Sequence, residues 1–459
     1  MGKYRAYESY KDSGVEWLGD IPEHWKLHKV KRTVSIFGRI GFRGYTTADI
    51  VSEGEGVITL SPSNIVDGKI NYLNRTYLSW EKYYESPEIQ VFSKDILFVK
   101  TGSTIGKVAI VENMPEPMTI NPQLVVLKKI NCYPEFLAYV MNADFYQFQV
   151  MGFRFGGSTP AMTQESLGQT QVILPPLEEQ KAIARFLDYK TDRIDALIAK
   201  KEALLEKLDE KRTALISHAV TKGLDATVPM KDSGIEWLGK IPEHWEVKKL
   251  RYVGSCQNGV SKGGDYFGSG YPFVNYTDVY ANLELPKVVN GLAQSTDADR
   301  INYSVEKGDI FFTRTSETIE EIGITSTCLS SIENAIFSGF LIRFRPFVEI
   351  IFEEFSKYYF RCQQHRLFFV KEMNLVTRAS LSQDLLKRLP VLLPPFKEQK
   401  EIAEHLDKKT AEIDNQKAKV REAIELLKEY RTSLITNAVT GKIDVRQVPL
   451  PNKSLSQTT

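Results

Sequence analysis

The stretch LPPLEEQKAIARFLDYKTDRID at 174–195 decides the fold, because a close copy, LPPFKEQKEIAEHLDKKTAEID, follows at 393–414. Each copy opens with a proline pair and then carboxylates. This pattern favours a helix start, since proline fits the first turn and carboxylates complement the helix dipole. Apolar heptads continue through RTALISHAV at 212–220 and RTSLITNAV at 431–439. The sequence therefore predicts two helices of roughly 40 residues, each about 60 Å long at a rise of ~1.5 Å per residue.

Apolar side chains recur at heptad spacing along both predicted helices, which is the pattern of helices that pack on one another. The positions expected to pair are Leu187, Ile194, Ile198, Leu205, Leu208, Leu215, Leu406, Ile413, Val420, Ile424, Leu427 and Leu434. Lys201, Arg212, Lys417 and Arg431 interrupt this seam. Because one chain must return on itself, the simplest arrangement packs the two helices antiparallel. The alternative is that each helix only caps its own domain.

A second pair of copies shows that the whole unit is duplicated. KDSGVEWLGDIPEHW at 11–25 returns as KDSGIEWLGKIPEHW at 231–245, with 13 of 15 residues identical. The offset is 220 residues for this pair and 219 for the helix pair, whereas the stretches between the markers have diverged far more. A constant frame that carries two different inserts suits a protein that reads two different things with one geometry.

The two inserts read as mixed domains. Short β-type runs bounded by Gly, Asn, Asp and Ser predict strands, at 95–100, 107–111, 123–129, 308–314 and 340–344. Helix-like pieces lie at 135–149 and 353–369. We therefore expect an α+β fold, in which two mixed α/β domains are joined by two long antiparallel coiled-coil helices with an internal pseudo-two-fold repeat. The expected boundaries are 1–172 and 223–391 for the domains, 173–222 and 392–445 for the helices, and 446–459 for a flexible tail.

Charge excludes a protein that binds nucleic acid through overall basicity. The chain of 459 residues has a net charge of +1. The first insert, 26–172, has 15 Lys/Arg against 13 Asp/Glu, and the second, 253–389, has 14 against 16. Any nucleic-acid binding must therefore use local patches or charge supplied by a partner.

The cysteines and the N-terminus bear on location. No cysteine belongs to a C-x-x-C pair or a His/Cys cluster with zinc spacing, so reduced structural thiols are expected, at Cys132, Cys256, Cys328 and Cys362. The start MGKYRAYESYKD lacks the apolar region of a signal peptide. Arg343, Arg345 and Glu349 break the most apolar run, at 335–352, so it is not a membrane span. We expect a cytoplasmic protein with no membrane partner.

Two motifs resemble catalytic or cofactor loops without matching them. DYFGSG at 265–270 resembles a loop that holds S-adenosylmethionine, but Leu393 stands where LPPF would need the Asn or Asp of a methyltransferase. GSTIGKVA at 102–109 resembles a phosphate loop, but its glycine spacing is one residue short and Val108 replaces the magnesium-binding Ser/Thr. A turn between two strands is the better interpretation of the second motif.

The histidines do not form a catalytic set. His24 and His244 occupy the same position in the two repeats, within the shared IPEHW segment. A histidine in a repeated frame is better explained as a structural hydrogen-bonding residue than as a base. With no nucleophile–base–acid set in sight, we expect this chain to catalyse nothing and to bind no cofactor or metal.

Taken together, the WLG-x-IPEHW segment, the variable insert, the LPP-x-x-EQ-x-x-I-x-x-x-L-D helix start and the second copy of all three resemble the DNA-specificity subunit of type I restriction–modification enzymes. The resemblance covers about residues 11–444. It implies that each insert is a target recognition domain reading one half of a split DNA site, and that the helices form a spacer. It also implies two adenine methyltransferase subunits and up to two ATP-driven translocase–nuclease subunits as partners. S-adenosylmethionine, ATP and magnesium are then expected on those partners.

Contact with double-stranded DNA needs Lys, Arg, small hydroxyls and free backbone N–H groups for phosphates, and bidentate Arg, Asn or Gln for base edges. Loops rich in Gly, Ser and Thr supply these groups, at 37–47, 100–107, 154–164, 258–267, 313–321 and 374–383. The candidate contacts are Arg39, Arg43, Lys100, Ser103, Thr104, Lys107, Arg154, Ser158, Lys262, Arg314, Thr315, Ser316 and Arg378. For each arginine the alternative is a solvated or ion-paired side chain.

Two other classes of protein stay open on the sequence. One is a remnant of a fused restriction–methylation enzyme, which would need the missing methyltransferase motifs. The other is a scaffold with two interaction modules on a coiled coil that does not bind DNA. A neighbouring gene for an Asn-Pro-Pro-Tyr/Phe methyltransferase would favour the DNA-specificity hypothesis over the scaffold.

Overall fold

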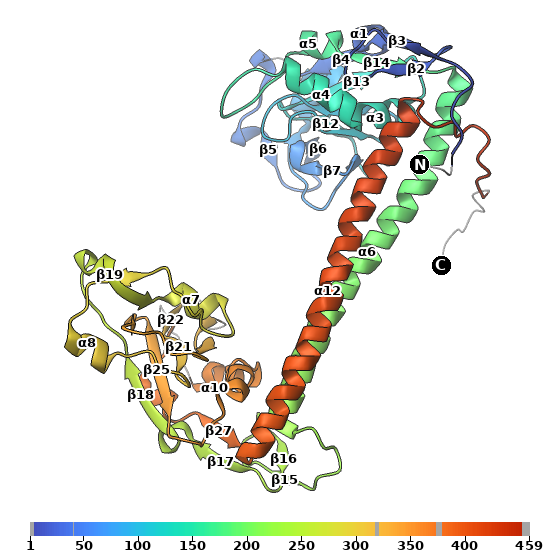
Figure 1. Ribbon diagram of the computed structural model, residues 1–459. Coiled ribbons are helices and arrows are strands. Elements are labelled where there is room, and N and C mark those ends of the chain that lie inside the picture. Colours follow the sequence, from blue (N-terminus) through green and yellow to red (C-terminus); the bar gives the residue numbers. More distant parts are fainter. Residues whose placement is uncertain (1–3, 40, 317–320, 373–378, 452–459) are drawn as a thin grey trace. The chain divides into compact units, whose positions relative to one another are not determined.

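The computed structural model describes residues 4–39, 41–316, 321–372 and 379–451 (Figure 1). The chain divides into two compact units. Unit 1 contains Met1–Lys201 and Glu422–Thr459, and unit 2 contains Glu202–Arg421. The sequence suggests five consecutive segments, whereas each unit here combines one mixed domain with a part of both long helices. Each unit is therefore built from segments that are far apart in the chain.

The two long helices begin and end as their sequences dictate. Helix α6 (Leu177–Lys222) has 46 residues and helix α12 (Phe396–Val439) has 44. Each begins directly after a Pro-Pro pair. Gly223 follows α6 with φ +77°, and Gly441 lies just beyond α12 with φ +73°. Glycine takes this left-handed conformation without a Cβ penalty, so it stops each helix cleanly.

The helices pack antiparallel within each unit, as predicted. In unit 1, Arg431 of α12 donates from Nε to Asp195 of α6 at 2.8 Å. In unit 2, Lys417 of α12 pairs with Asp209 of α6. Residue numbers increase along α6 where they decrease along α12, as in an antiparallel pair. The charged residues Lys417 and Arg431, which interrupt the apolar seam, each form an ion pair across it. The twelve apolar seam positions are buried or half-buried: Leu187, Ile194, Ile198, Leu205, Leu208, Leu215, Leu406, Ile413, Val420, Ile424, Leu427 and Leu434.

Unit 1 holds two four-stranded sheets. One has the order β11-β10-β13-β4 and is antiparallel throughout, and the other has the order β12-β6-β9-β5 with β12 parallel to β6. The strands are β1 (Tyr10–Asp12), β2 (Asp20–Pro22), β3 (Lys26–Lys29), β4 (Ser35–Gly38), β5 (Ile50–Val51), β6 (Gly56–Leu60), β7 (Ile65–Val66), β8 (Lys69–Ile70), β9 (Tyr77–Ser79), β10 (Ile96–Val99), β11 (Val108–Ile110), β12 (Met118–Ile120), β13 (Leu124–Lys128) and β14 (Gln171–Leu174). The short helices are α1 (Val30–Thr33), α2 (Trp80–Glu85), α3 (Pro134–Asn142), α4 (Asp144–Phe153) and α5 (Gln164–Gln169).

Unit 2 repeats the antiparallel sheet, in the order β18-β25-β21-β23, and carries a smaller sheet in the order β20-β19-β24. Its strands are β15 (Met230–Asp232), β16 (Lys240–Pro242), β17 (Glu246–Lys249), β18 (Gly254–Asn258), β19 (Phe267–Val274), β20 (Leu292–Ala293), β21 (Ile310–Thr313), β22 (Thr315–Ser316), β23 (Thr325–Thr327), β24 (Ile336–Phe337), β25 (Leu341–Pro346), β26 (Ala379–Ser380) and β27 (Pro390–Leu393). Its short helices are α7 (Tyr276–Ala281), α8 (Asp297–Asn302), α9 (Glu353–Tyr359), α10 (Gln364–Glu372) and α11 (Gln383–Leu386).

The end of the chain packs on unit 1 as far as it is described. Arg446 pairs with Asp444 at 2.7 Å and lies 3.7 Å from Glu179. Val448 and Leu450 pack against the apolar core of this unit. The flexible tail expected from residue 446 onward is therefore held in place at its start by one charge network and two apolar contacts, while residues 452–459 lie outside the described part.

Candidate nucleic-acid interface

The repeated IPEHW and EQ motifs form one hydrogen-bonded junction in each unit. In unit 1, His24 Nε2 lies 2.7 Å from Glu179 Oε1, and the buried indole of Trp25 donates to Glu179 Oε2 at 3.1 Å. Unit 2 repeats both contacts, at 2.7 and 3.0 Å, with its own set, His244, Trp245 and Glu398. The repeated histidines thus form structural hydrogen bonds that fix the start of a long helix to its domain.

A second repeated contact, which the sequence analysis missed, joins each domain to a long helix. In unit 1, Tyr139 of α3 donates its hydroxyl to Asp188 of α6 at 2.8 Å and lies 3.2 Å from the Thr191 hydroxyl. Unit 2 has the same triad at 2.7 and 3.1 Å, formed by Tyr358, Asp407 and Thr410. An aligned D-x-x-T in both helix copies, with a Tyr in both preceding helices, would have been the signal.

Unit 1 brings two of the predicted DNA-contacting loops together. The loop 100–107 connects antiparallel strands β10 and β11, which confirms that GSTIGKVA is a turn between strands. Lys100 accepts a hydrogen bond at its carbonyl from the Met162 amide at 2.8 Å, and the Gly102 amide donates to the Pro160 carbonyl at 2.9 Å. The loop 154–161 therefore lies directly beside the strand-end loop.

Unit 2 builds the same loop pair from a different sequence. The Arg314 carbonyl accepts from the Leu381 amide at 2.7 Å, as Lys100 does from Met162. Strand β22, which follows Arg314, pairs with β26 in the register Thr315↔Ser380. In both units the loop that precedes a short helix thus pairs with the chain beside a basic residue at the end of the central strand, through a two-stranded ribbon in unit 2 and an isolated bridge in unit 1.

Several predicted side chains on these loops are open to solvent. Ser103, Lys107, Arg154 and Ser158 are exposed, and Thr104 and Lys100 are half-buried. Among the residues that the structure describes, none of these six side chains has a hydrogen bond or ion pair. They are therefore available to an added partner.

In unit 2 the predicted contacts are only partly described. Arg314 is half-buried and donates one of its five N–H groups to the Gly339 carbonyl at 3.3 Å. Thr315 is half-buried. The side chain of Ser316 and the whole of Arg378 lie outside the described residues. Arg314 therefore keeps most of its donors for another acceptor.

Arg39 and Arg43 are engaged within the domain. The Arg39 side chain is buried and donates to the Ile120 carbonyl at 3.2 Å and the Thr119 hydroxyl at 3.3 Å. Burial lowers the pKa of Arg39 from its ordinary value. Arg43 pairs with Glu88 at 3.4 Å. Arg39 therefore shapes this loop from within, and direct contact of either arginine with DNA stays a prediction.

Lys262 is engaged in the same way in unit 2. Its ammonium lies 3.2 Å from Asp299 and 4.4 Å from the centre of the Tyr266 ring. The hydrogen bond that Lys262 donates to Asp299 raises the pKa of Lys262. The backbone N–H of Thr296 donates to the same carboxylate, and these partners hold the pKa of Asp299 at about 2. A phosphate would have to compete with this carboxylate for Lys262.

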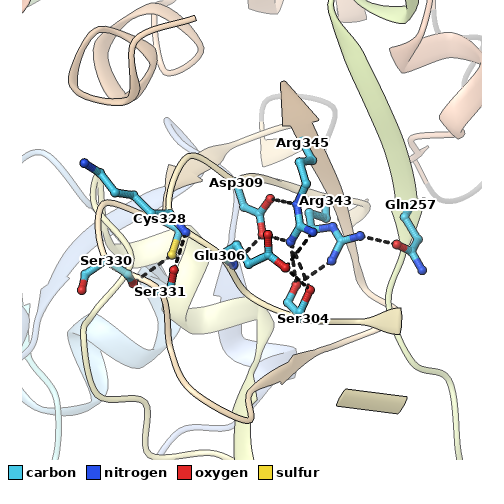
Figure 2. A network of polar contacts seen from close by, with 10 residues as sticks. Gln257, Ser304, Glu306, Asp309, Cys328, Ser330, Ser331, Arg343 and Arg345 are labelled. Atoms are coloured by element: carbon cyan, nitrogen blue, oxygen red, sulfur yellow. Dashed lines mark hydrogen bonds and ion pairs between the residues drawn. The ribbon is translucent and has the colours of Figure 1, made fainter. Parts of the chain in front are cut away.

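The base of the central strand in unit 2 is fixed by a buried polar network (Figure 2). Arg345 of β25 binds Asp309 with both ends of its guanidinium, at 2.6 and 2.7 Å, and also contacts Glu306 at 3.0 Å. Arg343 donates to the Ser304 carbonyl at 2.5 Å and to Gln257. This network sits at the opposite end of β21 from Arg314, so it anchors the strand and leaves the ribbon free.

Nothing in the described residues indicates a metal or membrane site. Within these ranges, no three His, Cys, Asp or Glu side chains come together as metal ligands. No helix in the described part of the chain is long and apolar enough to span a membrane.

A protein-family model matches residues 47–207 and 242–426, which together exceed half of the chain. Its description is "Type I restriction modification DNA specificity domain". The chain belongs to this family. It is a DNA specificity subunit with two target recognition domains, and membership assigns it to target specificity and not to catalysis. The resemblance, the fold class and the role expected from the sequence are thereby confirmed.

Two curated relatives match along nearly their whole length. The chain is 27% identical over 449 residues to the putative type I restriction enzyme MjaX specificity subunit of Methanocaldococcus jannaschii, covering 94% of this chain and 96% of that protein. It is 22% identical over 437 residues to the EcoKI specificity subunit of Escherichia coli K12, covering 93% and 90%. The match therefore extends over both repeats.

Two solved structures share the fold. One chain, from a study of complex assembly and conformational transition in a type I restriction–modification system, aligns with a TM-score of 0.69 at 17% identity over 92% of this chain and 99% of that chain. The HsdS subunit of Thermoanaerobacter tengcongensis aligns with a TM-score of 0.53 at 17% identity, over 92% and 98%. At this identity the likeness supports the fold alone.

Proposed function

We propose that this chain reads a bipartite DNA target, with one half-site for each recognition domain. One observation carries the proposal. Both units place a basic residue, Lys100 or Arg314, at the end of the central strand, beside a second loop that the same backbone hydrogen bond holds in place. Two equivalent reading loops with different side chains on a constant frame suit two different half-sites.

The loop side chains fall into groups that suit different contacts with DNA. Lys100, Lys107 and Arg154 carry positive charge into solvent and suit phosphates or base edges. Arg314 suits guanine, because its guanidinium can donate two parallel hydrogen bonds to O6 and N7. Arg43 and Lys262 would first release Glu88 and Asp299, and Arg39 supports its loop. The remaining proposed contacts are Ser103, Thr104, Ser158, Thr315, Ser316 and Arg378.

The long helices set the distance between the half-sites in this proposal. We take 1–172 and 223–391 as the target recognition domains, with 173–222 and 392–445 as the helical spacer. Constant helix length then fixes a constant non-specific gap in the DNA target.

The chain acts as the scaffold of a larger complex in this proposal. Its partners are double-stranded DNA, two adenine methyltransferase subunits and up to two restriction–translocase subunits. S-adenosylmethionine, ATP and magnesium belong on those partners, and the complex works in the cytoplasm. Membership of the specificity family supports this assignment.

The test is to purify the chain with its methyltransferase and to map methylated adenines across a genome that lacks the modification. We expect one bipartite motif with a fixed gap. The methyltransferase without this chain is the control and should leave the motif unmodified. A continuous motif, or the same motif without this chain, would contradict the proposal.

A further inference from the structure

Unit 1 has a groove of about 430 Å³ where its domain meets the start of α6. Two permanently charged side chains and two histidines line this groove, and none of its described lining residues is acidic. These four side chains are His24, Lys26, His28 and Arg32. The groove therefore has the charge of a site for an anion.

The walls of the groove are held together by backbone contacts, so their arrangement does not depend on a ligand. Lys26 lies directly opposite Leu174, where β3 pairs with β14 beside the start of α6 (Figure 1). The Asn131 amide donates to the Thr33 carbonyl at 2.9 Å, which joins the chain after β13 to the end of α1. The basic side chains thus project from a fixed frame.

Three of the basic side chains have no partner within the described part of the chain. Lys26 and Arg32 are exposed and His28 is half-buried, and none of them forms a hydrogen bond or ion pair there. His24 differs, because its Nε2 lies 2.7 Å from Glu179 as part of the junction described above. Two full charges and one imidazole are therefore available to an anion from outside the chain.

Unit 2 neutralises the same position from within its own sequence. At the offset of 220 residues, Glu246 stands where unit 1 has Lys26, and Lys248 stands where it has His28. Glu246 and Lys248 form an ion pair at 2.7 Å. The carboxylate that unit 1 lacks is thus supplied internally in unit 2.

The surrounding stretch shows the same difference in charge. KLHKVKRT at 26–33 has four Lys/Arg and no carboxylate, whereas EVKKLRYV at 246–253 has three Lys/Arg and one carboxylate. With histidine neutral, the net charge is +4 in unit 1 and +2 in unit 2. Tyr252 also replaces Arg32, so unit 2 loses the guanidinium at this position.

The groove lies at the end of the sheet opposite the loops proposed to read DNA. Strand β4 pairs with β13 from Ser35 to Gly38. The loop 37–47 continues from the Gly38 end, whereas Arg32 precedes the Ser35 end. A duplex read by these loops contacts the first end, so the groove at the second end suits an anionic group of a protein partner.

On the basis of the scaffold role proposed above, we infer that this groove binds an acidic segment of the methyltransferase subunit. Arg32 binds one carboxylate through two parallel N–H groups, and Lys26 binds a second through its ammonium. His28 supplies a further N–H donor. Because unit 2 forms the equivalent pair internally, each chain offers this contact once.

The first experiment detects the contact by zero-length coupling in the complex of the full-length chain with its methyltransferase. A water-soluble carbodiimide joins an amine to a carboxylate in contact with it, and mass spectrometry identifies the joined peptides. We expect an amide between Lys26 and an Asp or Glu of the methyltransferase. The pair of Lys94 and Glu135, at 2.5 Å in the same unit, is the internal positive control.

The second experiment closes the groove with the ion pair that unit 2 has. Lys26→Glu combined with His28→Lys supplies that pair on the same frame, and Lys26→Gln combined with Arg32→Gln removes both full charges without adding a carboxylate. We expect both double variants to bind the methyltransferase about 3–10-fold more weakly than wild type, with a shallower salt dependence, because an exposed ionic contact is lost. Calorimetric titration of the methyltransferase into the full-length chain measures the affinity.

Lys11→Gln is the matched control for the change in net charge. Lys11 is an exposed residue of β1 without an ion pair in the described ranges, and its substitution lowers the net charge by one, as the Glu/Lys double variant does. The control should bind the methyltransferase as wild type does. Melting temperatures and DNA affinity should be the same in all four chains.

The outcomes separate this contact from other occupants of the groove. Coupling of Lys26 to the methyltransferase, with weaker binding of both double variants, supports the inference. No coupling at Lys26 while Lys94 couples to Glu135, with unchanged affinity in both double variants, would overturn it. Weaker binding of all DNA sequences, or loss of saturable binding of inorganic phosphate, with unchanged methyltransferase affinity would assign the groove to a DNA phosphate or a free anion and overturn it too. A wild-type chain that binds no methyltransferase would contradict the scaffold role and this contact together.

Discussion

The two recognition domains hold the base of the same strand with different chemistry. In unit 1, Lys128 lies 3.6 Å from Asp95 and over the Phe92 ring at 4.6 Å. In unit 2, Arg345 grips the equivalent Asp309 at two points, and a wider network surrounds it. Both aspartates also accept a backbone N–H three residues upstream, from Phe92 and Glu306. The aspartate is thus common to both inserts, while its cationic partner differs between them.

The largest expected effect is the loss of stability when the aspartate of each pair is removed, and it should differ between the two units. Asp309→Ala should destabilise unit 2 by about 2–3 kcal/mol, because it removes the buried carboxylate that Arg345 contacts at two points and leaves this half-buried guanidinium with Glu306 as its ionic partner. Asp95→Ala should destabilise unit 1 by only about 1 kcal/mol, since Lys128 makes a single, longer contact. Hydrogen exchange of the β21 and β10 amides reports each unit separately.

A matched substitution sharpens this comparison. Arg345→Lys gives unit 2 the pair that unit 1 has, and should cost about 1–2 kcal/mol because the two-point contact becomes one. Equal losses in Asp309→Ala and Asp95→Ala would mean that the shared backbone hydrogen bond, and not the ion pair, holds the strand.

The next effect is on DNA binding at the strand ends. Arg314→Ala should cost about 1–3 kcal/mol on the target and relax discrimination at one base pair, if Arg314 reads guanine. Lys100→Ala should weaken binding about equally on all sequences and make the salt dependence shallower by about one charge, because a lysine ammonium suits a phosphate.

Titrations of the complex with target and single-mismatch duplexes at two salt concentrations measure both the base discrimination of Arg314→Ala and the salt dependence of Lys100→Ala. Arg43→Ala is the control with a smaller expected loss, since Arg43 must first release Glu88. Unchanged affinity in Arg314→Ala and Lys100→Ala would remove the two strand-end loops from the DNA interface.

A change of helix length should alter the target gap and leave both half-sites unchanged. One heptad inserted after Leu205 adds about 10.5 Å of helix, or about three base pairs. The register of the Asp195–Arg431 and Asp209–Lys417 pairs places residue 421 opposite Leu205, so a second heptad before that residue keeps the seam in phase. Methylation mapping of this double insertion should give a longer gap. An unchanged gap in an active complex would contradict the helical spacer.

The smallest expected effect is on acid stability. Asp299 in α8 has its pKa held at about 2, below the unfolded value of about 3.9. A depressed carboxyl pKa contributes stability that is present above about pH 4 and is lost as pH falls towards 2. The contribution should stay below about 1 kcal/mol, since Lys262, the ionic partner of Asp299, is exposed to solvent. Melting temperatures of Asp299→Asn and wild type should therefore converge only as pH falls to 2 and below, and an undiminished difference there would rule out this cause.

The sequence was sufficient for the long helices because their pattern is local. Proline pairs, acidic first turns and heptads determine a helix start and an apolar face with little help from the rest of the fold. The strands at 95–100 and 308–314 were also found, since short apolar runs that are buried on both faces stand out between turns. The helix-like segment 135–149 is helical, but the sequence did not show that it is divided in two. It forms α3 and α4, because Ala143 takes an extended backbone conformation between them.

The candidate site was harder to predict because it depends on contacts between distant segments. The loops at 100–107 and 154–164 were singled out separately, but their pairing through Lys100 and Met162 follows only from the fold. Arg39 shows the opposite failure. Its glycine-rich surroundings suggested an exposed loop, whereas its guanidinium is buried against the Ile120 carbonyl. Residue type alone does not distinguish an arginine that supports a loop from one that contacts a ligand.

The central claim is that two recognition domains on one constant scaffold each determine one half-site independently. The most direct test of this claim is an exchange of one insert. Residues 26–172 are replaced by the corresponding stretch of a relative with a known target, the constant segments stay unchanged, and the complex is used to map methylated adenines. We predict that one half of the bipartite target changes to that of the relative while the other half and the gap remain. A simultaneous change in both half-sites would contradict this account.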